Sequence, residues 1–399
     1  MLESSFLPPQ LPAERPSLRV AVVTETYPPE VNGVAMTLGR MVSGLHARSH
    51  HVQLIRPRQG IADAATTREN FEEVLKPGLP IPRYDSLRMG LPARQGLLRL
   101  WRDRRPDVVQ VATEGPLGWS AISAARKLRI PVASDFHTNF HSYSRHYGVG
   151  WLDKPIAAYL RRFHNQALVT MVPTHQMRDE LSANGYRNVR VVARGVDTRL
   201  FSPARRSAEL RAAWGAGDED VVVLVVGRLA PEKNLPVVVT AFAAMRRAQP
   251  RVKLVFVGDG PERPALARTF PQHVFAGMRT GEDLARHYAS GDVFLFASVT
   301  ETFGNVTLEA MASGLAVIAY DYAAARQHIR NGHNGLLAPF DQEIDFVRLA
   351  EAIAPDRVRL RALGRAARQS AEQVDWEIVY DDLERVLATL AAGDGPLEA

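Results

Sequence analysis

Short, strongly apolar runs separated by longer amphipathic stretches are the feature that most constrains how this chain of 399 residues can fold. The runs are rich in β-branched residues and apolar on both faces, as parallel strands buried between two layers of helices are. The stretches between them carry helical patterns, so the alternation predicts an α/β protein with right-handed crossovers. The expected strands are residues 18–24, 51–55, 107–111, 131–135, 167–172, 189–192, 221–226, 252–257, 274–276, 293–297 and 316–320. The expected helices are residues 34–48, 94–104, 117–128, 153–167, 235–248, 281–290, 306–313, 346–354, 357–369 and 376–391.

The expected strands fall into two groups, which predicts two doubly wound sheets. Residues 193–220 separate the groups and have the composition of a polar connection. No period of roughly 20–50 residues repeats along the chain, which excludes a solenoid. Open α/β sheets bind ligands beyond the carboxyl ends of their strands. With two such sheets facing each other, we expect the functional site to lie in the cleft between them.

Composition excludes several classes of protein. The chain contains no cysteine, which removes disulfides, thiolate metal sites and a cysteine nucleophile. With 46% hydrophobic residues, disorder is excluded as the main state. The longest apolar runs are far shorter than the ~18 residues of a membrane span. Residues 1–17 are rich in proline and lack the apolar region of a signal peptide, so we expect a flexible leader there.

Two strand-to-helix loops carry residues suited to phosphate groups. In the first group of strands, Gly33 lies where a helix begins, and its backbone N–H can approach an anion without a Cβ in the way. A full G-x-G-x-x-G fingerprint is absent. In the second group, Arg228 and Lys233 share the loop after residues 221–226. A chelating arginine and a point-charge lysine suit a diphosphate, and solvated surface cations are the alternative reading.

The segment at residues 300–314 is the sharpest motif. Glu301 closes the loop after a strand, and Glu309 follows eight residues later on the next helix. The first free backbone amides of that helix would come from Phe303, Gly304 and Asn305. The arrangement offers a carboxylate for sugar hydroxyls, amides for a phosphate, and a second carboxylate for a ribose diol. Carboxylates suit vicinal hydroxyls because they only accept hydrogen bonds.

Taken together, the motifs resemble those of the retaining glycosyltransferases of family 4, which have the GT-B fold of two Rossmann-like domains facing across a cleft. The resemblance spans about residues 18–385 and rests on Glu301 with Glu309, GRLAPEKN at 227–234, VGDGP at 257–261, PPEVNGV at 28–34, DFHTN at 135–139 and RGVDTRLFSP at 194–203. The stretch DFHTNFHSYSRHYG is most similar to the branch of mannosyl- and glucosyltransferases that act on lipid or glycolipid acceptors. The resemblance implies an acceptor-side domain at 18–198, a donor-binding domain at 199–371, and helices at about 372–392 that pack back on the first domain.

The resemblance also implies roles in binding the donor. Arg228 and Lys233 would neutralise the donor diphosphate as it leaves. Gly33 would lie against the distal phosphate, and Glu309 would bind the ribose. Glu301, together with the amides of residues 303–305, would hold the transferred sugar.

The remaining site residues lie in the first half of the chain. His137 would lie near the primary hydroxyl of the sugar and the reacting centre. A lone histidine is usually structural, but this one ends a strand that points at the expected cleft. The acceptor-side candidates are Asn139, His141 and Tyr143.

The expected reaction differs from that of a retaining glycosidase, because no well-placed nucleophilic carboxylate is visible. The resemblance implies front-face attack, with the leaving phosphate helping to deprotonate the acceptor. No cofactor and no metal are expected, and the nucleotide sugar is a substrate, of the GDP-mannose or the UDP-glucose type. Asp218 and Asp220 form a D-x-D sequence, but they precede a strand, which favours a polar linker over a pair of metal ligands.

The charge is distributed unequally between the two halves of the chain. The net charge of +6 combines +10 in residues 1–200 with −4 in residues 201–399. Because the donor phosphates would be met in the acidic half, the basic half is free to face an anionic membrane or acceptor. Residues 88–105 and 153–166 combine basic and apolar side chains, so each can lie on a membrane surface or pack its apolar face on the sheet. We expect a cytoplasmic enzyme, peripheral on the inner face of the cytoplasmic membrane.

Three rival functions follow from the same residues. A sugar-nucleotide epimerase could use the same fold, and a non-catalytic protein could bind a sugar nucleotide. A nucleic-acid-binding protein could use the basic half. This last reading is disfavoured because no zinc, helix-turn-helix or RNP signature is present, and Glu301 and Glu309 would then have no role.

Overall fold

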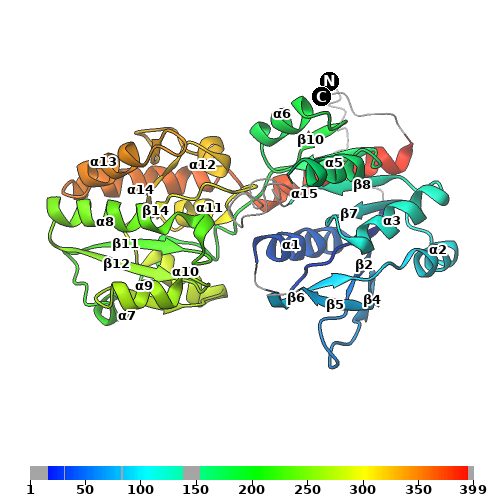
Figure 1. Ribbon diagram of the computed structural model, residues 1–399, viewed down its shortest axis with the longest axis horizontal. Coiled ribbons are helices and arrows are strands. Elements are labelled where there is room, and N and C mark those ends of the chain that lie inside the picture. The colour runs from blue at the N-terminus through cyan, green and yellow to red at the C-terminus, as the bar shows by residue number, and fades with distance from the viewer. Residues whose placement is uncertain (1–16, 31, 82–83, 138–152, 394–399) are drawn as a thin grey trace, which may run out of the picture.

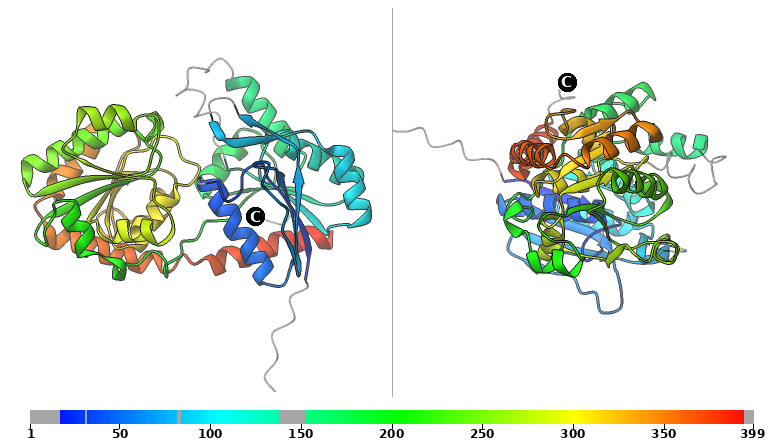
Figure 2. Two further views of the ribbon diagram at one scale, coloured as in Figure 1. Left: turned by 90° about the horizontal axis from the view of Figure 1, so that it is seen from below. Right: turned by 90° about the vertical axis from the view of Figure 1, so that its left-hand side faces the viewer.

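A computed structural model describes residues 17–30, 32–81, 84–137 and 153–393 of the chain (Figure 1). Two bodies stand side by side, and each is a twisted sheet with helices on both faces (Figures 1 and 2). The predicted α/β class with two parallel sheets is therefore confirmed.

The first sheet has the order β10-β9-β8-β7-β1-β2-β4-β3, and all its pairs are parallel except β3 with β4. Its strands are β1 (Arg19–Val23), β2 (His51–Pro57), β3 (Thr67–Arg68), β4 (Phe71–Lys76), β7 (Val108–Val111), β8 (Val132–Asp135), β9 (Val169–Val172) and β10 (Val189–Val191). A separate two-stranded ribbon is formed by β5 (Gly78–Ile81) and β6 (Tyr84–Gly90). The helices of this part are α1 (Gly33–Ala47), α2 (Arg94–Asp103), α3 (Pro116–Lys127), α5 (Asp153–His164) and α6 (His175–Ala183).

The second sheet is parallel throughout and has the order β13-β12-β11-β14-β15-β16. Its strands are β11 (Val221–Val226), β12 (Val252–Val257), β13 (Val274–Gly277), β14 (Val293–Phe296), β15 (Ala316–Tyr320) and β16 (Leu336–Ala338). Its helices are η2 (Pro203–Arg205), α7 (Ala208–Ala213), η3 (Pro231–Lys233), α8 (Leu235–Ala248), α9 (Arg263–Thr269), α10 (Gly281–Ala289), α11 (Asn305–Ala312), α12 (Ala323–His328), α13 (Glu343–Ile353) and α14 (Arg357–Ala371). The order reverses at β11, between β12 and β14, and such a switch point is where open α/β sheets bind ligands.

The helix α15 (Trp376–Ala392) returns to the first sheet (Figure 2). Its buried apolar residues join the core formed by β1, β2 and α1; they are Val379, Leu383, Val386, Leu387 and Leu390. Arg48, just after α1, holds the helix through Glu377 at 2.6 Å, Asp381 at 2.8 Å and Glu384 at 2.7 Å. The helix α15 therefore completes the core of the first sheet. The expected domain boundaries at 198/199 and 371/372 stay a prediction.

Two chain segments connect the sheets. One precedes the second sheet in the sequence, and the other follows it. They are joined by a backbone hydrogen bond in which Val196 N donates to Val374 O at 3.1 Å. Gly195 lies directly against the second segment, since a Cβ at this position would be 2.8 Å from the nitrogen of Trp376. Residues 192–202 and 372–375 thus form one tightly packed connection between the sheets, called the strut below.

The arginine-rich helix α2 packs its apolar side on the first sheet. Leu97, Leu98 and Trp101 are buried in the core there, and Trp101 Nε1 donates to Gln53 Oε1 at 2.9 Å. Of the two readings that the sequence left open for this stretch, the packing of the apolar face on the sheet is observed. The arginines Arg99 and Arg102 face solvent.

Candidate active site

The loops that follow β11 and β12 pack backbone against backbone. Gly227 and Gly258 have φ of 137° and 138°, in the region that favours glycine. A Cβ on Gly258 would lie 1.9 Å from the carbonyl oxygen of Gly227, so a side chain there would force the loops apart. Leu229 N also donates to Asp259 O at 2.9 Å. The loop that carries Arg228 is therefore held rigidly at the carboxyl edge of the second sheet.

Lys233 and Glu301 are brought together from different loops. Lys233 ends the short helix η3 after β11, and Glu301 follows β14. The Lys233 ammonium contacts Glu301 Oε1 and lies 5.6 Å from the ring centre of Phe296. Arg228, in the same loop as Lys233, has its Nη1 3.7 Å from Oε1 of the buried Glu232. Two carboxylates and two cations thus gather at the switch point.

The predicted segment 301–305 forms the turn into α11. Gly304 has φ of 90° and caps the helix, which begins at Asn305. Phe303 is buried beneath this turn, and its carbonyl accepts a hydrogen bond from Ala324 N at 2.8 Å. Tyr322 Oη donates to the carbonyl of Glu301 at 2.9 Å. These contacts leave the first amides of α11 at the helix terminus, where an anion is stabilised.

Glu309 lies one turn further along α11 and contacts a second helix. Tyr288 Oη, from α10, donates to Glu309 Oε2 at 2.9 Å. Glu309 is partly accessible as a whole residue, but its carboxyl group is buried. This burial raises the pKa of Glu309 from 4.5 to about 7, and the Tyr288 hydrogen bond opposes the rise. Glu309 is therefore a carboxyl group that lacks the hydration of an ordinary surface glutamate.

Gly33 and Asn305 meet across the two sheets. Asn305 Nδ2 is 3.4 Å from Gly33 O and 3.3 Å from Thr37 Oγ1 on α1. Asn32 caps α1 by accepting a hydrogen bond from Ala35 N at 2.8 Å. The N-termini of α1 and α11 therefore face each other, and both present partial positive charge.

His137 lies two residues beyond β8 and is buried. Its Nδ1 is 2.5 Å from Arg194 Nη2, and its Nε2 is 3.4 Å from Asp135 Oδ2. Burial lowers the pKa of His137, as does the charge of Arg194, while Asp135 opposes the shift. The motif at 194–203 contains Arg194 but gave it no role, although an arginine–glycine pair shortly after β10 was a signal. The acceptor-side candidates Asn139, His141 and Tyr143 lie outside the described residues.

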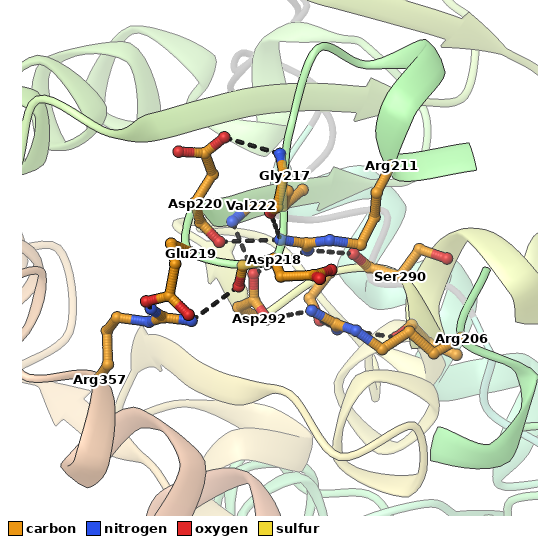
Figure 3. Close-up of polar contacts among 12 residues, drawn as sticks. Arg206, Arg211, Gly217, Asp218, Glu219, Asp220, Val222, Ser290, Asp292 and Arg357 are labelled. Atoms are coloured by element: carbon orange, nitrogen blue, oxygen red, sulfur yellow. Dashed lines mark hydrogen bonds and ion pairs between the residues drawn. The ribbon is translucent and has the colours of Figure 1, made fainter. Parts of the chain in front are cut away.

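The D-x-D sequence directly precedes β11, and Figure 3 shows its surroundings. Arg228 follows the carboxyl end of the same strand, at the opposite edge of the sheet. A strand of this length spans roughly 20 Å. Asp220 accepts hydrogen bonds from Gly217 N at 2.7 Å and from Arg251 Nε at 2.8 Å. The contact with Gly217 lowers the pKa of Asp220, as does Arg251. The Asp220 carboxylate thus stabilises the local fold, in agreement with the expectation of a polar linker.

A metal site and a cavity are two other kinds of site that the described residues could form. Within the described ranges, no group of three or more histidine, aspartate or glutamate side chains is arranged to hold a metal ion. A cavity of about 320 Å³ opens between α12 and α14, and it is lined by Gln327, His328, Arg330, His333, Asn334, Ala366, Gln369, Ser370 and Gln373. None of the predicted donor-site residues lines that cavity.

Two parallel sheets with phosphate-suited loops at their facing edges are the architecture of the GT-B fold, and a solved structure agrees. Sucrose-phosphate synthase from Thermosynechococcus elongatus superposes with a TM-score of 0.77 and 19% identity, over 94% of this chain and 100% of that one. The predicted GT-B fold is thereby confirmed.

The family follows from the sequence comparisons. The family model described as "Glycosyltransferase Family 4" matches residues 31–200, and the one described as "Glycosyl transferases group 1" matches residues 220–356. A GDP-mannose-dependent alpha-mannosyltransferase of Mycobacterium tuberculosis is 35% identical over 92% of this chain and 95% of that protein. An alpha-monoglucosyldiacylglycerol synthase of Streptococcus pneumoniae is 29% identical over 76% of this chain and 71% of that protein. The chain belongs to the family 4 glycosyltransferases and is an enzyme of that class.

Proposed function

We propose that this enzyme transfers a hexose from a nucleotide sugar to a hydroxyl group of a membrane lipid or glycolipid, with retention of configuration. The observation that carries the proposal is the meeting of Lys233 with Glu301 at the switch point of the second sheet. A cation suited to phosphate and a carboxylate suited to sugar hydroxyls there stand side by side. A diphosphate sugar has these two parts adjacent to each other.

GDP-mannose is the first donor to test, and UDP-glucose is the second. The similarity to the mycobacterial GDP-mannose-dependent enzyme supports the first, because it extends over nearly the whole chain. That relative is an alpha-mannosyltransferase by name, and the sugar of GDP-mannose is itself α-linked. An α-product from an α-linked donor is the result of retention, so the same stereochemistry is proposed here.

Residues of both sheets would stabilise the leaving diphosphate. Arg228 and Lys233 would neutralise the charge that develops on it, which usually is the largest catalytic contribution. The facing N-termini of α1 and α11, at Gly33 and Asn305, would add backbone amides and partial positive charge from both sides. The leaving phosphate would then help to deprotonate the acceptor hydroxyl on the same face of the sugar, with no glycosyl-enzyme intermediate.

The remaining donor contacts would come from two glutamates. Glu301 would accept hydrogen bonds from hydroxyl groups of the transferred hexose, and Glu309 from the ribose diol. Tyr288 would keep the Glu309 carboxyl group in place through its 2.9 Å hydrogen bond. No metal ion is proposed for the reaction, since cationic side chains and helix termini already face the expected diphosphate.

A lipid acceptor is proposed from the similarity to the pneumococcal synthase, whose name specifies a diacylglycerol glycolipid. No helix in the described part of the chain is long and apolar enough to cross a membrane. Attachment would instead be peripheral and electrostatic, through exposed basic residues of the first half such as Arg99, Arg102, Arg161 and Arg162. The apolar face of α2 would not insert, because it packs on the sheet.

Donor binding and transfer test the proposal separately. A donor present at 100 times its Kd stabilises the protein by about 2.7 kcal/mol, so thermal unfolding with GDP, UDP and ADP sugars identifies the nucleotide. Transfer is then measured with labelled donor and a lipid extract, and the sugar nucleotide is analysed alone to detect epimerisation. Substitution Lys233→Met should lower kcat about 100-fold, whereas Lys253→Met, at the other edge of the same sheet, should not. Binding without transfer to any acceptor would favour the non-catalytic alternative.

A further inference from the structure

A buried chain of polar side chains links the candidate histidine to the strut between the two sheets. Gln110 Nε2, on β7, donates to Asp135 Oδ2 at 2.6 Å. Asp135, at the end of β8, lies 3.4 Å from His137 Nε2, and Arg194 Nη2 lies 2.5 Å from His137 Nδ1. All four residues are buried, with exposed fractions of 0% for Gln110 and 6% for Arg194. Buried polar groups arranged in this way specify one geometry.

The guanidinium of Arg194 determines which nitrogen of His137 can carry a proton. Arginine has five N–H donors and no acceptor, and it remains charged in proteins. Its Nη2 therefore donates to His137 Nδ1, and that nitrogen must be unprotonated. A neutral imidazole then carries its single proton on Nε2. A proton on Nδ1 as well would set two donors against each other at 2.5 Å.

The surroundings of His137 also favour its neutral form. The charged groups near it are Arg194, from the strut; Asp135, on β8; and Glu114, beyond β7. Burial is the largest cause of its lowered pKa, followed by the charge of Arg194, while Asp135 and Glu114 oppose them. The Arg194 guanidinium is itself buried, and its pKa is lowered to about 10, so it is still a cation at neutral pH.

The protonated nitrogen of His137, Nε2, does not donate a hydrogen bond to any described neighbour. At 3.4 Å, Asp135 Oδ2 is too far for a good hydrogen bond. Across the described residues, His137 Nε2 has no hydrogen-bond partner, and the same is true of Asp135 Oδ1. Leaving a buried donor unsatisfied costs free energy, so an N–H group in this state can donate to a substrate oxygen when one arrives.

We propose that Arg194 is a positioning residue that fixes His137 as the neutral Nε2–H tautomer, so that His137 acts as a hydrogen-bond donor to the substrate and not as a general base. The proposal rests on the proposed function for its substrate, a hexose donor. In His137, the nitrogen that could accept a proton, Nδ1, already accepts a hydrogen bond from Arg194, and Nε2 already carries a proton. Acceptor deprotonation is thereby left to the departing phosphate.

Three substitutions test this assignment. Arg194→Gln removes the cation, and the glutamine carbonyl can accept a proton from Nδ1, so the imidazolium is no longer opposed. We expect kcat to fall about tenfold to a hundredfold, as for other groups that orient a histidine, with KM nearly unchanged. In Arg194→Gln the neutral ring can place its proton on Nδ1, so we also expect part of the activity to return as the pH falls through the raised pKa of His137, because the imidazolium again carries a proton on Nε2. Arg194→Lys keeps a cationic donor and should restore most of kcat without the new pH dependence. Arg187→Gln, at an exposed site in the loop before β10, is the matched control and should behave as the parent.

A spectroscopic measurement tests the tautomer without any activity assay. The chain has twelve histidines, so the ring nitrogen signals of His137 are assigned by comparison with His137→Gln. We expect the parent protein to hold the Nε2–H form from about pH 5 to pH 8, and Arg194→Gln to titrate within this range. If the parent transfers no hexose, the proposed function fails, but the tautomer spectrum still tests Arg194. A protonated Nδ1 in the parent, or an Arg194→Gln variant with parental kcat and pH profile, would overturn the inference.

Discussion

Glu309→Gln should move folding stability and donor affinity in opposite directions. Burial raises the pKa of Glu309 from 4.5 to about 7. Below pH 4.5 the folded and unfolded states both hold the proton, and the group contributes nothing to the pH dependence. Between 4.5 and 7 only the unfolded chain releases the proton, so stability falls as the pH rises. Above pH 7 this loss is complete, and it is absent from the glutamine variant.

The magnitude follows from the size of the pKa shift. A rise of this size corresponds to about 3 kcal/mol at pH 8 and less than about 1 kcal/mol at pH 5. The residual accessible surface of Glu309 screens part of this, and we take about 2 kcal/mol as the difference between the two pH values. Glu309→Gln should raise the unfolding temperature of the second domain above that of the parent. This increase should be about 6 °C larger at pH 8 than at pH 5.

Thermal unfolding at both pH values measures this difference, and any constant cost of burying the glutamine amide cancels. Glu282→Gln is the control, because this glutamate belongs to the same domain and its side chain is 78% exposed. Donor titration of the same proteins should show Glu309→Gln binding about tenfold more weakly, since a hydrogen bond to a charged group is lost. Equal pH dependence of unfolding in the parent and in Glu309→Gln would refute the reasoning.

Three further predictions concern metal, membrane and the C-terminal helix. Transfer should persist in EDTA and in Asp220→Asn, because this carboxylate binds Gly217 and Arg251 at the far edge of the sheet; loss of activity that Mn²⁺ or Mg²⁺ restores would contradict it. The protein should sediment with anionic liposomes at low salt and be released at high salt, and failure to bind would argue for a soluble acceptor. Arg48→Gln should lower the stability by about 2 kcal/mol through loss of its contacts with α15, whereas Arg385→Gln, which loses one exposed contact, should lie within ~0.5 kcal/mol of the parent by denaturant unfolding.

The central strands of both sheets could be predicted from local pattern. The bounds of β11, β12 and β15 match the expected ranges, because a strand buried on both faces is apolar at nearly every position. The strand β4 (FEEVLK) escaped notice because it lies near the sheet edge, is only partly buried and carries charges. The strands β5 and β6 form a separate ribbon with weak alternation.

The candidate site divides in the same way. Glu301 and Glu309 are recognisable because nine consecutive residues of one loop and helix carry the whole motif. The partners of these side chains are not, since Tyr288 reaches Glu309 from another helix and Arg194 reaches His137 from the connection that follows β10. No local period relates such residues, and only the packing of the sheets brings them together. The roles of the site residues therefore remain predictions that the substitutions above are designed to test.

The return of α15 to the first sheet has a consequence for how the protein is made. The apolar surface over β1, β2 and α1 is covered by Leu383, Leu387 and their neighbours, which are translated only after the entire second domain. The domain synthesised first is thus the last to be completed, and its exposed core must stay soluble throughout elongation. A chain that ends anywhere in the second domain would leave the first domain without α15, and its apolar core residues would be exposed to solvent. Incomplete chains of this protein should therefore aggregate more readily than the finished enzyme.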